Sequence, residues 1–225
     1  MGRVMNTAEI NDAALMRSVA VGDYEVFHNI LETYLDLVVR TSFRILCDSE
    51  DSKAVAVEVF GRIWMKAGQY DSSRPLSEWL LVMTCRLCRR RYFIRRLPGM
   101  LTDRPEVYVM SHPRLPWDDD YITKQAWEFY CRASAKLSLR ERVIYTLCEL
   151  EGLTISQVHY ITGLRPSAII DALMHARNQV RNHISYRAYV NFLRRMTVSL
   201  ADTSELEREI RARINFNMEN SMGRL

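Results

Sequence analysis

The chain has 225 residues, of which 48% are hydrophobic and 26% are charged, and its formal net charge is +4. These proportions indicate one or two folded domains and exclude wholesale disorder. No run approaches the roughly 18 apolar residues of a membrane span, and the first ten residues lack the apolar core of a signal peptide. We therefore expect a cytoplasmic protein with no membrane partner.

The chemistry-bearing residues do not form an enzyme or metal pattern. Cys85-x-x-Cys88 has ligand spacing, but no second such pair or histidine pair accompanies it, and zinc takes four ligands. The five histidines are scattered and show no nucleophile–base–acid spacing. We expect no catalytic residue, no metal and no cofactor. The 27 arginines against 4 lysines give mild support for phosphate partners.

Helical periodicity runs through the chain, with eight glycines and no long alternation of polar and apolar residues. This predicts an all-α fold with a first domain over residues 7–97. Gly22-Asp23 marks a break and a helix cap, a second helix stops at Cys47-Asp48, and a fourth starts near Leu76. Trp64 and Trp79 are expected in the core.

The fourth helix carries the stretch Arg86 to Arg96, RLCRRRYFIRR, with six arginines, two aromatics and no acid. Guanidinium forks suit phosphates and flat rings suit stacked bases, so the stretch is typical of a nucleic-acid interface. The alternative is a solvated basic face or a patch for an acidic protein.

Residues 98–120 contain four of the six prolines and end in three aspartates, which predicts a linker. Residues 121–184 are again helical. Thr154 can cap a short helix, Gly163 permits a tight turn, and Pro166 suits the first turn of a second helix. This pattern predicts a helix-turn-helix within the second domain.

Residues 185–225 form a predicted amphipathic helical extension. Asp202-x-x-Glu205 fits a capping box, and Leu206, Ile210 and Ile214 share one helical face. We expect this apolar stripe to be buried against another surface. Either the tail folds back on the second domain, or it binds another protein or a second copy.

In order and spacing, six motifs make the chain resemble a bacterial RNA polymerase sigma factor of the extracytoplasmic-function (ECF) group. The resemblance covers roughly residues 12–97 and 134–184. The motifs are Gly22–Phe27, Arg44–Asp48, Glu58–Trp64, Tyr70-Asp71 with Pro75–Leu80, Leu137–Arg142, and the helix-turn-helix within Leu153–Arg181.

The resemblance implies that the first domain docks on the clamp of core RNA polymerase and melts the minus-ten element of promoter DNA. The second domain would read the minus-thirty-five element in the major groove. Glu58, Phe60, Arg62 and Trp64 would form or support the polymerase-binding surface. The implied DNA-binding residues are Ser72, Ser73, Arg74, Arg86, Arg89, Arg90, Arg91, Tyr92, Arg95, Arg96, Arg165, Ser167 and Arg177, with Phe93 as an alternative to Tyr92 for stacking.

Three segments depart from the family pattern. On the arginine helix, Arg86 and Arg90 stand where the family carries asparagine and aspartate. On the clamp-binding helix, Asp51–Val57 lacks two acids and a glutamine that the family carries. On the recognition helix, Ile169–Ala172 replaces a basic run, and Ile170 and Met174 are expected to face outward. This apolar face suits a protein partner better than a DNA groove. An anti-sigma factor or activator would bind there or at the tail.

Three functions follow. The first is a transcription initiation factor that binds core RNA polymerase and directs promoter recognition and melting, with a partner supplying part of the specificity. The second is a sigma-like interaction protein that sequesters an anti-sigma factor or occupies polymerase without initiating. The third, an ordinary helix-turn-helix repressor, requires residues 121–225 to bind duplex DNA alone.

Overall fold

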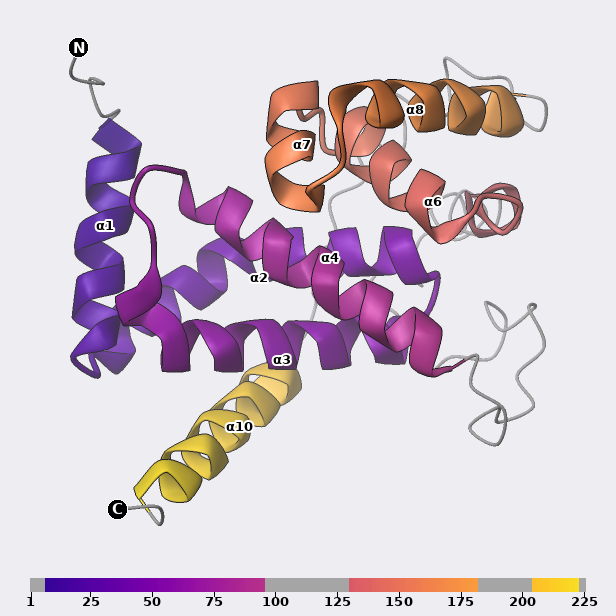
Figure 1. The fold of residues 1–225 in the computed structure, drawn as a ribbon. Coiled ribbons are helices and arrows are strands. Elements are labelled where there is room, and N and C mark those ends of the chain that lie inside the picture. Colours follow the sequence, from indigo (N-terminus) through magenta and orange to yellow (C-terminus); the bar gives the residue numbers. More distant parts are fainter. Residues whose placement is uncertain (1–6, 96–129, 182–203, 223–225) are drawn as a thin grey trace.

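The computed structural model describes residues 7–95, 130–181 and 204–222. The predicted linker 98–120, Arg96 and Asp202 lie outside these residues. Every regular element described is a helix, which confirms the predicted all-α fold (Figure 1). In the described ranges, no helix is long and apolar enough to cross a membrane. The helices are α1 (Thr7–Ala20), α2 (Tyr24–Leu46), α3 (Ser49–Lys66), α4 (Leu76–Ile94), α6 (Leu139–Tyr145), α7 (Ile155–Thr162), α8 (Pro166–Arg181) and α10 (Ser204–Met222).

Local signals place the boundaries of α2 and α3 where the sequence predicts them. Gly22 has φ +91°, a conformation that glycine adopts without strain. The Asp23 side chain accepts a hydrogen bond from the Val26 amide at 3.2 Å and caps α2. Cys47 ends the helix in the left-handed region, with φ 53°. Asp48 then caps α3, since its side chain accepts from the Asp51 amide at 2.8 Å.

Helices α1 to α4 pack around one apolar core (Figure 1). Phe27 of α2 and Phe60 of α3 meet edge to face with ring centroids 6.4 Å apart, and Trp64 lies 5.3 Å from Phe27. The start of α4 has no side-chain cap of its own. Instead, Asp12 of α1 accepts a hydrogen bond from the Leu76 amide at 2.9 Å, which ties α1 to α4.

Helices α7 and α8 lie where the sequence predicts the two helices of a helix-turn-helix, and a tight turn at Gly163 separates them. Thr154 and Gln157 make a reciprocal capping box at the start of α7. Gly163 ends α7 with φ 71°, and Pro166 is the first residue of α8. The inner face of the pair is buried, and it comprises Val158, Ile161, Ile169, Leu173, Ala176 and Val180, while Ile155 is partly buried.

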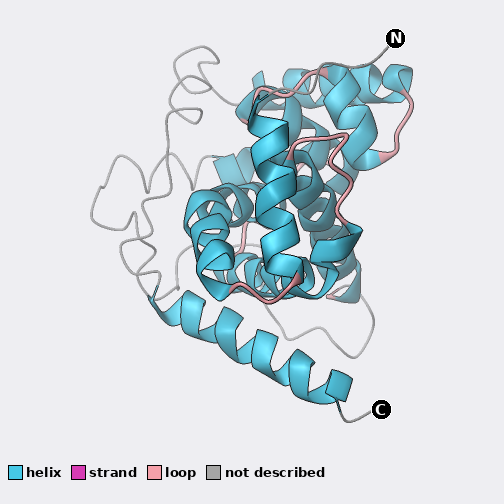
Figure 2. Ribbon diagram, turned by 90° about the vertical axis from the view of Figure 1, so that its left-hand side faces the viewer, coloured by secondary structure: helices cyan, strands magenta, loops and turns pink. Residues whose placement is uncertain are grey.

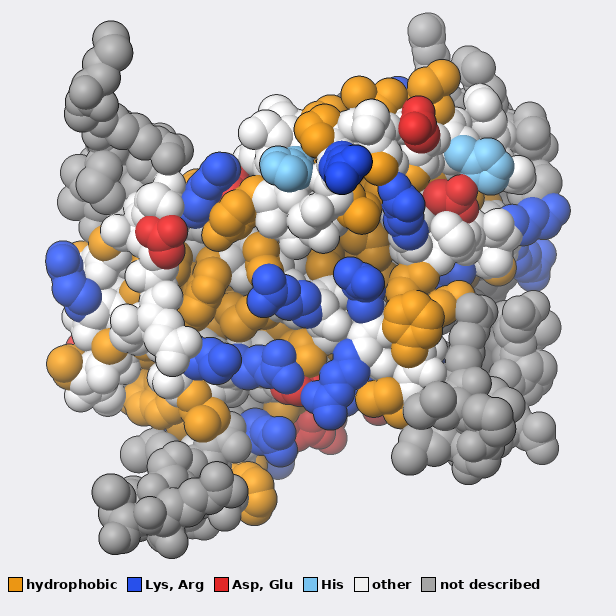
Figure 3. Space-filling model, viewed as in Figure 1, with side chains coloured by type: hydrophobic (Ala, Val, Ile, Leu, Met, Phe, Trp, Pro, Cys, Tyr) orange, Lys and Arg blue, Asp and Glu red, His pale blue; other side chains and the backbone are white. Residues whose placement is uncertain are grey.

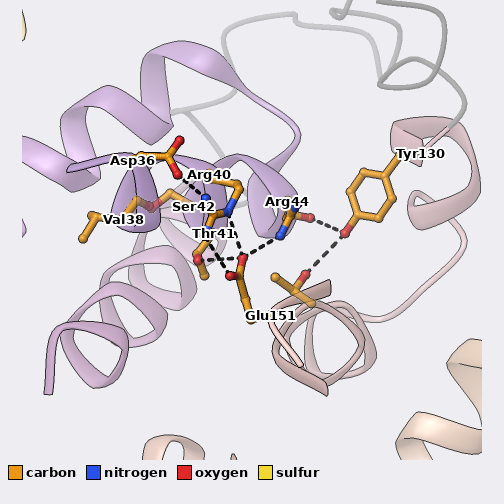
Figure 4. A network of polar contacts seen from close by, with 9 residues as sticks. Asp36, Val38, Arg40, Thr41, Ser42, Arg44, Tyr130 and Glu151 are labelled. Carbon is orange, nitrogen blue, oxygen red and sulfur yellow. Dashed lines mark hydrogen bonds and ion pairs between the residues drawn. The ribbon is translucent and has the colours of Figure 1, made fainter. Parts of the chain in front are cut away.

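The two groups of helices meet at a polar seam (Figure 4). A wide, π-helical turn, Thr146–Leu150, follows α6 and brings Glu151 against α2. The Glu151 carboxylate accepts from Arg44 Nη1 at 2.6 Å, from Arg40 Nη2 at 3.0 Å and from Thr41 Oγ1 at 3.3 Å. Arg44 is only 1% exposed. Burial lowers the pKa of the Arg44 guanidinium, and the charge of Glu151 opposes this shift.

Backbone carbonyls at the end of α2 complete the seam. Tyr130 donates its hydroxyl hydrogen to the Arg44 carbonyl at 2.7 Å, and Arg142 of α6 donates to the Ile45 carbonyl at 3.1 Å. The end of α2 therefore binds groups that follow it by 86 and 97 residues. The carbonyls that a helix leaves unpaired at its C-terminus are satisfied here by the other half of the molecule.

Helix α10 packs on α3, on the side of the bundle away from α6 to α8 (Figures 1 and 2). The predicted stripe of Leu206, Ile210 and Ile214 is buried, at 6%, 1% and 2% exposed. The expectation that this tail folds back on the second domain is therefore wrong. On the outer face of α3, Ala54 and Val57 line a cavity together with Glu209 and Arg213 of α10.

We predict that Glu151→Ala destabilises the protein by about 3–5 kcal/mol, because it leaves the buried Arg44 charge without its carboxylate. Urea unfolding measures this change. Glu32→Ala is the control: Glu32 is 61% exposed on the same helix, α2, that carries Arg44, and its loss should change the free energy of unfolding by no more than about 0.5 kcal/mol. Equal stability of the two variants would contradict a structural role for the seam.

We also predict that the Cys47 thiol titrates near neutral pH. A hydrogen bond from Cys131, the charge of Arg142 and a hydrogen bond from Ser134 favour the thiolate and lower the pKa of Cys47 to about 7 despite burial. Burial raises the pKa of Cys148 to about 11 and that of Cys85 to about 12. Iodoacetamide labelling followed by mass spectrometry should therefore modify Cys47 with a midpoint near pH 7.

The same shift links stability to pH. The pKa of Cys47 is lower in the folded than in the unfolded chain. The Cys47 thiolate therefore stabilises the fold fully above pH 9.0, the pKa of the unfolded thiol, and this stabilisation is lost as pH falls through about 7. The difference in unfolding free energy between the wild type and Cys47→Ser should grow between these two pH values. Labelling of Cys47 in parallel with Cys148 would refute the assignment.

Candidate nucleic-acid interface

Helix α4 buries one side in the core and presents arginines on the other. Leu80, Leu87 and Cys88 lie in the core, whereas Arg86 and Arg89 are exposed. Neither of these two arginines has an acidic partner among the described residues. Figure 3 shows basic side chains gathered in a band over α4, interspersed with apolar ones. This band is the cationic surface that the sequence predicts.

The remaining described arginines of the stretch are ion-paired. Arg95 contacts Asp48 at 3.0 Å and Asp51 at 2.8 Å, and Arg91 contacts Asp51 at 3.2 Å. These two aspartates lie at the start of α3, beside the end of α4. A phosphate must compete with these carboxylates for Arg91 and Arg95, whereas at Arg86 and Arg89 it meets no competing carboxylate from the described part of the chain.

Arg90 is paired more weakly. It lies 3.4 Å from Glu58 and its side chain is 63% exposed. A pair this exposed contributes little to stability, so Arg90 can exchange Glu58 for a phosphate at small cost. The described arginines of the stretch thus fall into three groups. Two have no acidic partner in the described structure, one is weakly paired, and two are firmly paired.

The two aromatic residues of the stretch have different environments. Phe93 is 58% exposed, whereas Tyr92 is partly buried and packs against the core. Their rings meet edge to face, with centroids 5.7 Å apart. An exposed ring can stack on a base, while a half-buried ring can only support it. The two rings, which the sequence leaves as alternatives, thus differ in exposure.

The loop before α4 is held by its own hydrogen bonds. Asp71 accepts from the Ser73 amide at 2.9 Å and from the Ser73 hydroxyl at 2.7 Å, and these bonds lower the pKa of its carboxyl. Tyr70 donates to the Arg74 carbonyl at 2.6 Å. Ser72 lies between them at the tip and is partly exposed.

Arg74 of this loop is engaged with its neighbours. It lies 3.3 Å from Glu78, and its guanidinium sits over the ring of Tyr160 in α7, 4.5 Å from the centroid. Glu78 in turn accepts a hydrogen bond from Gln157 at 3.0 Å. Arg74 thus connects the first group of helices to the helix-turn-helix.

A cavity of about 270 Å³ lies between α4 and the helices α6 and α7. Arg86 and Arg89 line it from α4, and Arg140 and Tyr160 line it from the other side. Arg140 and Tyr160 are absent from the site predicted from the sequence. No local pattern could have placed them there, because they approach α4 only through the packing of the two halves.

Helix α8 presents a mixed surface. Arg165 and Ser167 are exposed at its start. Arg177 is paired, with Nε 2.7 Å from the Glu149 carboxylate. Ile170 and Met174 are exposed, as the sequence predicts, at 46% and 57%. An exposed apolar pair between basic residues can meet a thymine methyl or a protein surface.

The residues expected to bind polymerase lie on different sides of α3. Phe60 is fully buried, so it supports the helix from inside and touches no partner. Trp64 is partly buried against Phe27 and Tyr24. Glu58 and Arg62 are paired at 2.5 Å on the outer side.

Comparison with known proteins gives a likeness of fold. No protein-family model matches the chain, and no curated protein matches it. Among solved structures, "Structure of CnrH in complex with the cytosolic domain of CnrY" has a similar fold, with a TM-score of 0.58 and 16% sequence identity. The match covers 76% of this chain and 95% of the matched chain. At this identity the likeness shows the fold alone.

We predict that Asp51→Asn strengthens binding to single-stranded DNA, because it releases Arg91 and removes one of the two carboxylates that pair with Arg95. The slope of log K against log salt should steepen by about one, the equivalent of one or two further phosphate contacts. Titration of a labelled oligonucleotide at several salt concentrations measures both quantities. Glu50→Gln is the matched control, since it removes one charge beside Asp51 from a carboxylate that pairs only with Lys53 in the described structure. Equal effects of the two variants would show that net charge alone matters.

Proposed function

We propose that the protein is a transcription initiation factor that binds core RNA polymerase and directs promoter recognition and melting, with a partner supplying part of the DNA specificity. The observation that carries the proposal is the exposed pair Arg86 and Arg89, without acidic partners in the described structure, beside the exposed ring of Phe93 on α4 of an ECF sigma-like fold. Cations beside a stacking surface suit a separated DNA strand.

A protein partner is part of the proposal. The solved neighbour contains CnrH with the cytosolic domain of a second protein, CnrY, and this supports a partner of the anti-sigma kind here. The exposed Ile170 and Met174 on α8 favour protein contact over groove contact. Arg165, Ser167 and Arg177 remain the candidates for any minus-thirty-five contact by this helix.

One observation favours the second candidate, a sigma-like interaction protein that occupies polymerase or an anti-sigma factor without initiating. Arg91 and Arg95 are already neutralised by Asp48 and Asp51, which reduces the cationic surface for melted DNA. The two functions differ in what Arg86 and Arg89 do, because only an initiation factor needs them for DNA.

The test is the variant Arg86→Glu/Arg89→Glu. We expect it to retain core RNA polymerase in a pull-down but to lose at least about tenfold in affinity for single-stranded DNA, through lost phosphate contacts and added repulsion. The probes are purified core polymerase and a labelled oligonucleotide. Arg17→Glu/Arg132→Glu is the control: it makes the same change in net charge at two exposed arginines outside α4.

The outcomes separate the candidates. Loss of DNA affinity in the α4 variant alone, with polymerase retained, supports the initiation factor. Equal DNA affinity in both variants, with polymerase retained, favours the interaction protein. Arg62→Glu tests the polymerase side in place of a Phe60 substitution, because Phe60 is a core residue whose truncation costs about 3–5 kcal/mol of stability.

A further inference from the structure

Helix α10 lies across the outer face of α3 (Figures 1 and 2). Its contact is made by Leu206, Ile210 and Ile214, which follow one another at four-residue spacing and are all buried. These three side chains belong to the same apolar cluster as the core of α1 to α4. The helix is therefore docked on the bundle through a continuous apolar stripe.

One part of this contact includes a residue of the proposed polymerase surface. A cavity of about 200 Å³ lies between the helices, lined by Ala54, Val57 and Glu58 of α3, Arg91 of α4, and Glu209 and Arg213 of α10. Glu58 therefore lies beside α10, in addition to its ion pairs with Arg62 and Arg90. A partner that contacts Glu58 along α3 must enter the space beside Glu209 and Arg213.

A second part of the contact lies next to Trp64. Arg211 of α10 donates a hydrogen bond from Nε to the Tyr24 hydroxyl at 3.1 Å, and its guanidinium lies 4.5 Å from the centroid of the Tyr24 ring. The Tyr24 ring meets Trp64 edge to face at 6.1 Å. Helix α10 thus contacts the surroundings of both Glu58 and Trp64.

The contact is well suited to reversal. It includes three buried apolar side chains and one exposed arginine, Arg211, which contacts Tyr24 through a hydrogen bond and a cation–π pair. Such a helix buries enough apolar surface to hold its place but little enough for a competing partner to displace it.

We propose that α10 is an intramolecular cover for the polymerase-docking face of α3, so that α10 and core RNA polymerase compete for the same surface. The proposal rests on the proposed function. In the covered state the chain binds polymerase weakly, because the apparent affinity is reduced by the fraction of molecules in which α10 is displaced. A partner that captures the Leu206–Ile214 stripe would release the face.

The test compares full-length variants for binding to purified core RNA polymerase. Ile210→Asp/Ile214→Asp places two carboxylates in the buried stripe and should raise the affinity for polymerase by at least about tenfold. Ala212→Asp/Asn215→Asp is the matched control, because it adds the same charges at exposed positions of the same helix and should leave the affinity unchanged.

A milder variant guards against misfolding of the first. Arg211→Ala removes an exposed side chain that contacts Tyr24, and it should tighten polymerase binding about two- to fivefold, as expected from the loss of one exposed cation–π pair. Circular dichroism checks that each variant keeps its helices.

The outcomes are distinct. If the wild type and the two α10 variants bind polymerase equally, or if the α10 variants bind more weakly, the cover is refuted and the proposed function stands. If neither the wild type nor the two α10 variants retain polymerase, both the proposed function and the proposal that α10 covers α3 are refuted. Tighter binding in the order wild type, Arg211→Ala, Ile210→Asp/Ile214→Asp supports both.

Discussion

One buried carboxylate joins the two helical groups at the polar side of their contact. Glu151 accepts hydrogen bonds from Arg40, Thr41 and Arg44, and all three come from a single turn of α2. Taking an arginine such as Arg44 out of water is costly unless its charge is balanced and its donors are satisfied. The second half of the molecule supplies that balance. Helix α2 can bury Arg44 only while α6 and its π-helical turn remain in place.

This constraint determines what lies next to the arginine helix. With Glu151 seated on α2, helix α7 packs against α4, and Tyr160 and Gln157 meet Arg74 and Glu78. The cavity beside Arg86 and Arg89 is a product of that packing. A substitution in the loop before α4 therefore affects two surfaces: the loop itself and its contact with the helix-turn-helix.

Local chemistry explains how much of this could be predicted. The caps at Asp23 and Thr154 and the turn at Gly163 depend on neighbours within a few residues, and periodicity predicts which positions of α8 and α10 are buried. The ion pairs of Arg91 and Arg95 join residues about 40 or more apart, and no pattern of spacing encodes them. The apolar stripe on α10 predicts that this helix packs against another surface, but the stripe does not specify which surface. Only the structure shows that α10 packs on α3.

Helix α3 is where the proposed functions converge. Its first turn carries Asp48 and Asp51, which decide how many arginines of α4 remain available to a phosphate. Its outer face carries Glu58, beside which α10 docks. Because α3 is rigidly packed on its inner side through Phe60, a partner on the outer face meets a fixed surface, and only α10 has to move. An event that exposes the docking face also removes Glu209 and Arg213 from the cavity that they share with Glu58 and Arg91.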